Sequence, residues 1–236
     1  MARRFGSLVT KLYVARPPEG MSDLAVLQHH FLTAAEEMRG SLTGYQTELF
    51  EGIETESILE VGHPVATIVD LARRLSPGII MMPTRGYSPF RQLLLGSVTS
   101  GVLHDAECPV WTCAHADDDV AIPTSYKSIV CAVDLGAASG AVLAAATELA
   151  SAFGASFHPL CVRDAEAPAE GERQPLASSV EVIHAANVAA GVVIAEERYQ
   201  ADLLVIGRGK AQGVLGRLRT NAHDLIRYSR CPVLSV

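Results

Sequence analysis

Apolar and polar positions follow two different periods along the second half of the chain. Residues 128–133 form a continuous apolar run rich in β-branched side chains, which predicts a strand buried on both faces. An alanine-rich stretch from Ala138 to Phe153 predicts a helix, which Gly154 would end in a left-handed conformation. The same patterns predict strands at 157–162, 180–184, 203–206 and 233–236, and a helix at 188–199. Strands that alternate with helices favour an α/β fold with an open, doubly wound parallel sheet, whose ligands lie beyond the carboxyl ends of the strands.

The first half repeats this pattern, but only from the end of its first helix. Phe5-Gly6 aligns with Phe153-Gly154, and Leu12-Tyr13-Val14 aligns with Leu160-Cys161-Val162. We therefore expect the first copy to lack strand 1 and helix 1, either because the chain is an N-terminally truncated version of a longer protein or because another chain supplies the strand. The rest of this copy predicts helices at 22–39 and 64–75 and strands at 56–61 and 79–82.

A glycine-containing block gives the clearest internal repeat. In the first copy it runs from Met82-Pro83-Thr84-Arg85-Gly86 through Leu95-Gly96-Ser97-Val98-Thr99 to Cys108-Pro109-Val110-Trp111. An altered version runs from Ile206-Gly207-Arg208-Gly209-Lys210 through Arg219-Thr220-Asn221 to Cys231-Pro232-Val233-Leu234. The repeat divides the chain into domains at 1–113 and 127–236, with an aperiodic linker at 114–126.

The Gly96-Ser97 pair at a helix start has a direct physical use. We expect Ser97 to cap the helix, the free amides of Val98 and Thr99 to point outward, and the helix dipole to favour an anion there. Glycine at 86 and 96 lets the backbone pass close to that anion. A di- or triphosphate fits this description best.

Composition narrows the class of protein. Of the 236 residues, 49% are apolar and 19% charged, which allows a substantial core and argues against disorder. The net charge of −7 leaves no basic footprint for nucleic acid. Five cysteines within or beside apolar runs are typical of reduced, buried thiols in a cytoplasmic protein. The sequence has no run of about 20 apolar residues and no secretion signal, so we expect a soluble cytoplasmic protein with no membrane partner.

These motifs resemble the universal stress protein family, whose nucleotide-binding members carry Gly-x2-Gly-x9-Gly-Ser/Thr between the fourth strand and the fourth helix. Gly86, nine intervening residues, Gly96 and Ser97 match that pattern in register, and Cys-Pro-Val heads the fifth strand in both copies. The resemblance covers nearly the whole chain as a tandem pair. It implies two flavodoxin- or Rossmann-like open parallel sheets of order 3-2-1-4-5. Their fifth strands, at 110–113 and 233–236, would pair antiparallel in an intrachain pseudo-dimer.

The resemblance also implies a nucleotide, usually ATP, at the switch point between strands one and four. AMP or ADP are alternatives, and Mg²⁺ would enter only with the nucleotide. In the first copy the matching positions are Val14, Met82, Arg85, Gly86, Gly96, Ser97, Val98 and Thr99. In the second copy the matching positions, a weaker set, are Asp134, Val162, Gly207 and Thr220.

Neither copy matches the family pattern completely. In the first, Pro83 replaces a glycine, and without the central strand its neighbours would lie apart or pair directly. In the second, Gly207 and Gly209 stand one residue too close together, and Arg219 occupies the place of Gly96. The basic side chains there would either attract phosphate or fill its cradle; they are Arg208, Lys210, Arg217 and Arg219.

Other candidate sites are weaker. His29-His30 lies on a solvated helix, and the group of Cys113, His115 and residues 117–119 lacks metal-ligand spacing, so no metal site is predicted. Gln212 breaks the dinucleotide fingerprint, and Ala211 breaks the Walker pattern. Asp134 fits a helix cap as well as a ligand contact.

No Ser-His-Asp or Cys-His set is readable in the sequence, so no catalytic residues are predicted. Three functions stay open. The first is an ATP-binding regulator in stress adaptation, with its site in the first copy. The second is a nucleotide-free interaction module with an unknown protein partner, and the third is a weak phosphohydrolase. The sequence leaves open whether two chains associate into a homodimer.

Overall fold

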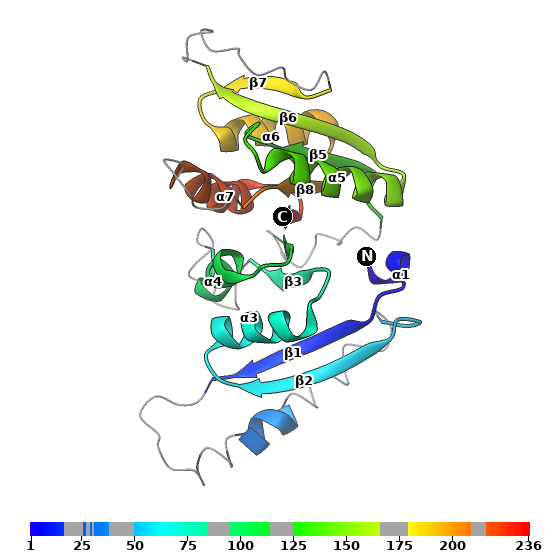
Figure 1. The fold of residues 1–236 in the computed structure, drawn as a ribbon, viewed down its shortest axis with the longest axis vertical. Coiled ribbons are helices and arrows are strands. Elements are labelled where there is room, and N and C mark those ends of the chain that lie inside the picture. Colours follow the sequence, from blue (N-terminus) through cyan, green and yellow to red (C-terminus); the bar gives the residue numbers. More distant parts are fainter. Residues whose placement is uncertain are drawn as a thin grey trace. The chain divides into compact units, whose positions relative to one another are not determined.

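A computed structural model describes residues 1–16, 26, 29, 31–37, 50–84, 95–113, 125–165, 179–208 and 216–236, without the side chains of 216–220 (Figure 1). The chain packs as two compact units, Met1–Leu75 and Ser76–Val236. The linker at 114–126 was predicted from the sequence repeat, and this division into units does not test it. Its residues 114–124 lie outside the described part of the chain. In the described part of the chain, no helix has the length and hydropathy needed to cross a bilayer.

The first unit contains a parallel pair of strands with a helix packed on it. Its elements are α1 (Ala2–Phe5), β1 (Val9–Ala15), β2 (Thr55–Val61) and α3 (Pro64–Leu75). β1 pairs with β2 from Val9↔Thr55 to Ala15↔Val61, and α3 packs against β1. Residues 26, 29 and 31–37 are helical, and the other positions of the predicted helix at 22–39 lie outside the described residues.

The end of α1 supports the alignment of the two copies. α1 ends at Gly6, whose φ is 60°, and α5 (Ser139–Phe153) ends at Gly154, whose φ is 66°. Both glycines hold the left-handed conformation that ends a helix without a side-chain penalty. The aligned Phe-Gly pairs therefore have the same local structure.

The second unit is built on a seven-stranded sheet in the order β3-β4-β9-β8-β5-β6-β7. Its strands are β3 (Ile80–Pro83), β4 (Val110–Cys113), β5 (Ser128–Ala132), β6 (Ser156–Asp164), β7 (Glu181–Ala185), β8 (Leu203–Ile206) and β9 (Val233–Ser235). Its other helices are α4 (Ser97–Asp105), α6 (Val188–Tyr199) and α7 (Gly216–Tyr228). Numbered within the second copy, β5 to β9 lie in the order 3-2-1-4-5.

The two copies meet within this sheet. β4 pairs antiparallel with β9 through Val110↔Ser235, Trp111↔Leu234 and Thr112↔Val233, whereas the other neighbours in the sheet are parallel. β3 and β4, from the first copy, thus extend the sheet of the second copy.

The two fifth strands pair antiparallel as expected, and strands two and four of the first copy, β1 and β3, do not pair directly with each other. Among the described strands, β1 pairs with β2 alone and β3 pairs with β4 alone, so the first copy contributes to two different sheets. The physical reason is that no described strand pairs with both β1 and β3. A sheet can continue only where a strand offers hydrogen-bonding groups on both of its edges.

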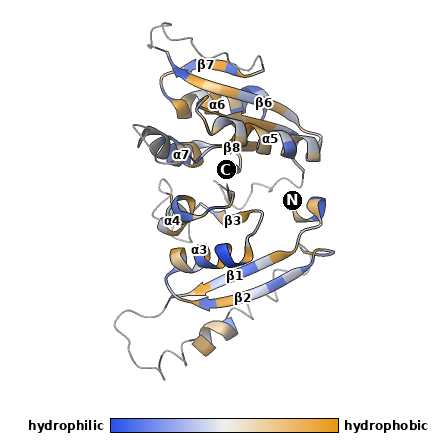
Figure 2. Cartoon of the chain, in the orientation of Figure 1, coloured by the Kyte–Doolittle hydropathy of each residue, from blue (hydrophilic) through white to orange (hydrophobic). Residues whose placement is uncertain are grey.

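The core of the second unit follows the apolar pattern of the sequence. All four residues of β8 are buried, as a continuous apolar run predicts for a strand covered on both faces. α5 is hydrophobic over most of its length (Figure 2) and packs against β5, β6 and β8. Cys131, Cys161 and Cys231 are buried free thiols, while Cys108 and Cys113 are only half-buried. Burial raises the pKa of the Cys131 thiol to about 12, which makes it a poor nucleophile.

A close approach of helix and sheet requires a glycine in α6. The side chain of Asn187 caps this helix by accepting a hydrogen bond of 2.9 Å from the amide of Ala190. One residue later, a Cβ placed on Gly191 would lie 2.5 Å from Cγ1 and 2.7 Å from Cγ2 of Val162. α6 can therefore pack directly on β6 only because residue 191 has no side chain.

Gly191→Ala is expected to lower the free energy of unfolding by about 1–3 kcal/mol, because the added methyl group must push α6 away from Val162. The measurement is urea unfolding followed by circular dichroism. Gly140→Ala in α5 is the control, since a Cβ there meets no atom within 4 Å. It should stabilise the protein by about 0.5–1 kcal/mol through helix propensity. Equal effects of the two substitutions would contradict this account of the α6 packing.

Candidate functional site

The start of α4 is tied to the end of β3. The amide of Gly96 donates to the carbonyl of Thr84 at 2.9 Å, and the buried hydroxyl of Thr99 donates to the carbonyl of Pro83 at 2.9 Å. Thr84 in turn donates its hydroxyl to the carbonyl of Cys113 on β4 at 2.8 Å. These bonds fix the first turn of α4 beyond the carboxyl end of a parallel strand, where ligands of such sheets bind.

The expectation that Ser97 caps this helix is wrong. Gly96 is the N-cap residue, with φ −61° and ψ 144°, and no side chain caps the helix. Ser97 is already the first helical residue and is exposed, so its hydroxyl does not hold the capping position. Glycine is accepted at an N-cap because the backbone there is extended.

The first turn of α4 leaves backbone amides without an acceptor among the described residues. The amide of Ser100 donates to the carbonyl of Gly96 at 2.8 Å, which closes the first helical hydrogen bond. In the described part of the chain, no group accepts a hydrogen bond from the amides of Ser97, Val98 or Thr99. Donors left at a helix start, together with the helix dipole, favour an anion.

The structure brings together only part of the predicted first-copy site. Met82 on β3 and Gly96, Ser97, Val98 and Thr99 on α4 belong to the second unit. Val14 is half-buried near the end of β1 in the first unit. Arg85 and Gly86 lie outside the described residues.

In the second copy, Asp134 directs a turn between β5 and α5. Its Oδ1 accepts hydrogen bonds from the amide of Gly136 at 2.8 Å and from the hydroxyl of Ser139 at 2.9 Å. Leu135, which lies between Asp134 and Gly136, has φ 62°, an unusual conformation for a bulky residue. Asp134 therefore shapes the loop, and Ala138, not Asp134, is the N-cap of α5.

The other second-copy positions are held by packing or lie outside the description. Val162 on β6 is in close contact with Gly191, and a Cβ on Gly207 would lie 3.0 Å from Val142. Thr220, Arg217 and Arg219 are helical residues of α7, but their side chains are outside the described part. Gly209 and Lys210 are outside it altogether.

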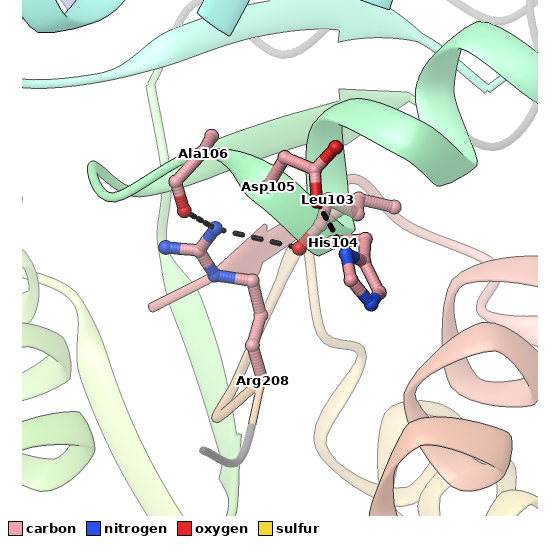
Figure 3. Close-up of polar contacts among 5 residues, drawn as sticks. All are labelled: Leu103, His104, Asp105, Ala106 and Arg208. Atoms are coloured by element: carbon pink, nitrogen blue, oxygen red, sulfur yellow. Dashed lines mark hydrogen bonds and ion pairs between the residues drawn. The ribbon is translucent and has the colours of Figure 1, made fainter. Parts of the chain in front are cut away.

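Arg208 does not serve as a free phosphate-attracting group, which corrects the expectation for this side chain. Its guanidinium donates to the carbonyls of Ala106 at 2.6 Å and Cys108 at 2.8 Å, with a longer contact of 3.5 Å to Leu103. Figure 3 shows it lying against the C-terminus of α4, a helix of the other copy. A cation is favourable there because the last carbonyls of a helix lack helical partners. Burial lowers the pKa of Arg208, although a guanidinium stays protonated at neutral pH.

In the second copy, the turn after α7 corresponds to the turn after α4. It is held by a buried carboxyl of the same copy, Glu196. The hydroxyl of Ser229, after α7, lies 2.6 Å from Oε1 of Glu196 on α6, and the amide of Arg230 donates to Oε2 at 3.0 Å. Glu196 is only 3% exposed. Burial raises its pKa, partly offset by hydrogen bonds from Ser229, Arg230 and Cys231. The sequence reasoning did not predict this residue or the contacts of Arg208.

Within the described residues, no group of three or more His, Cys, Asp or Glu side chains is placed to hold a metal ion. Of the linker residues considered for metal binding, Cys113 is described at the end of β4. His115 and residues 117–119 lie outside the description.

Comparisons with known proteins agree on one family. The sequence model of the Universal stress protein family matches residues 1–113 and 165–236. A universal stress protein from Archaeoglobus fulgidus has a similar structure, with a TM-score of 0.73 at 20% identity over 99% of this chain and 87% of that chain. A putative universal stress protein from Pseudomonas aeruginosa has a TM-score of 0.64 at 16% identity over 96% and 92%. At these identities the two structures show a shared fold. A search of curated proteins gave no match.

Glu196→Gln tests the buried carboxyl through pH. Because the folded pKa is raised, the favourable contribution of protonated Glu196 is fully present below its ordinary value of 4.5 and is lost as pH rises through the folded pKa. The unfolding free energy of the wild type should therefore fall relative to that of the Gln variant as pH rises from 4.5. Urea unfolding across this range measures the difference. Glu197→Gln, at an exposed position paired with Arg230, is the control and should show no such trend. A pH-independent difference for Glu196→Gln would refute the assignment.

Proposed function

The chain belongs to the universal stress protein family, and from this premise we propose that it is a regulator in stress adaptation that binds an adenine nucleotide. ATP is the proposed ligand, with AMP and ADP as alternatives, and Mg²⁺ enters with the nucleotide. The proposed site is in the first copy.

The start of α4 is the single observation that carries this proposal. Three successive amides, from Ser97 to Thr99, have no acceptor in the described part of the chain, and they begin a nine-residue helix. The exposed side chain of Ser97 adds a hydroxyl donor beside them. Amides and hydroxyl together suit the oxygens of a phosphate chain, which need several donors in one small region.

The remaining contacts follow from the family motif. Met82 is half-buried on β3, one residue before Pro83, whose carbonyl bonds to Thr99 of α4. Arg85 and Gly86 are carried over from the motif, on the phosphate and ribose side. The chain offers no recognisable catalytic set, so we propose a regulatory binding protein in which hydrolysis of ATP is at most a weak side activity.

The alternative function is a nucleotide-free protein-interaction module of the same fold. The specific observation in its favour is that Arg208, the first basic residue of the second glycine loop, binds the carbonyls of Ala106 and Cys108 just after α4. Its charge is therefore engaged within the protein. Asp134 likewise has Oδ1 engaged by Gly136 and Ser139.

Gly96→Glu is expected to abolish ATP binding, because it places a carboxylate among the amides that would hold phosphate. In the wild type, ATP at 100 times its Kd should raise the unfolding free energy by about 2.7 kcal/mol. Thermal unfolding with and without ATP measures this stabilisation, and calorimetry measures the affinity.

Gly78→Glu is the matched control, since Gly78 is exposed in the turn before β3 and a Cβ there meets no atom within 4 Å. It should retain the stabilisation by ATP. If ATP, ADP and AMP all leave wild-type unfolding unchanged, the interaction-module alternative replaces nucleotide binding.

A further inference from the structure

Arg208 of the second copy contacts the end of α4 in the first copy. The strand register makes Thr84 the counterpart of Arg208, because the amide of each follows its strand and donates to the end of the neighbouring fifth strand, at Cys113 and Val236. The Thr84 hydroxyl, however, also bonds to Cys113 within its own copy. Thus the side chain of Arg208 bonds to the other copy, whereas the Thr84 hydroxyl bonds within its own copy.

The C-terminal ends of α4 and α7 occupy equivalent places in the two copies, but different side chains hold them. The turn after α7 is held by Glu196, which belongs to the same copy. The turn after α4 has Ala106 where the second copy has Ser229, and its carbonyl binds Arg208. The C-terminus of α4 therefore relies on a side chain from the other copy.

α4 is held at both ends over a short distance. Its first turn is tied to β3 through Gly96 and Thr99, and the carbonyl of its C-cap residue Ala106 is bound by Arg208. Nine residues at 1.5 Å each make the helix about 13 Å long. A short helix with two anchors transmits a displacement of one end to the other, because its backbone hydrogen bonds keep it rigid.

We propose that Arg208 is a positioning residue for the anion site of the first copy: by holding the C-terminus of α4, it fixes the direction of the amides at Ser97, Val98 and Thr99. This inference rests on the proposed function of that site. It gives a basic residue of the second glycine loop a role in supporting the helix that follows the first loop. Arg208 acts through the helix and does not touch the ligand.

Arg208→Gln and Arg208→Lys in the full-length chain test this role with two measurements. The first is hydrogen exchange of the Ser100 amide, which donates to Gly96 at the far end of α4. The second is calorimetry with ATP. In Arg208→Gln we expect exchange at Ser100 to be about tenfold faster and ATP binding to be about three- to tenfold weaker, the size of effect expected when charged hydrogen bonds are lost. Lysine keeps the charge but not the fork of donors, so Arg208→Lys should fall between Gln and wild type.

Two controls separate positioning from general destabilisation. Arg230→Gln removes an exposed arginine after α7, paired with Glu197, and should leave both measurements unchanged. The Val133 amide, which donates to Leu160, reports on the core and should keep its wild-type exchange in Arg208→Gln.

Wild-type exchange at Ser100 in Arg208→Gln would overturn the proposal, and so would an equal acceleration at Val133. If the wild type binds no adenine nucleotide, the proposed function fails separately. The exchange measurement still decides whether Arg208 positions the first turn of α4.

Discussion

The antiparallel ladder between β4 and β9 is the constraint on which the second unit depends. β9 is the outer strand of the second copy, and a buried outer strand needs partners for its backbone groups. β4 supplies them, and Val110, Thr112 and Val233 at this joint are fully buried. The same pairing brings the segment after β8 next to the end of α4, because the amide of Arg208 donates to Val236. The contact between Arg208 and α4 is thus a consequence of how the two fifth strands pair.

The two copies differ in the side chain that stabilises the turn before their fifth strands, β4 and β9. Both turns have the sequence Cys-Pro-Val after a helix, but one is stabilised by a buried acid and the other by an arginine from the opposite copy. A buried carboxyl favours its protonated form, whereas a guanidinium keeps its charge, so the two turns respond differently to pH. The first copy keeps a helix start whose donors have no acceptor in the described part of the chain, and the second copy contributes an arginine that binds the end of that helix.

Much of the secondary structure could be predicted from the sequence. The helices at 64–75 and 188–199 and the strand at 203–206 are confirmed at their predicted bounds, because periodicity, Pro64, Asn187 and a continuous apolar run are local signals. The cap of α4 could not be predicted, because Gly96 and Ser97 are both residues that N-caps accept and the sequence does not say which of them is the last before the helix. The partners of Arg208 lie about a hundred residues away in sequence, and no local pattern reveals them. Glu196 did leave a signal, since it follows Val192 by four residues on the buried face of α6.

The joint between the copies also contains the chain's single tryptophan. Trp111 is only 6% exposed and lies in the middle of β4, opposite Leu234. Its intrinsic fluorescence therefore reports on this one seam, without a label and without background from other indoles. A red shift of its emission would signal that water has reached the ladder between the copies, even while the helices elsewhere keep their ellipticity.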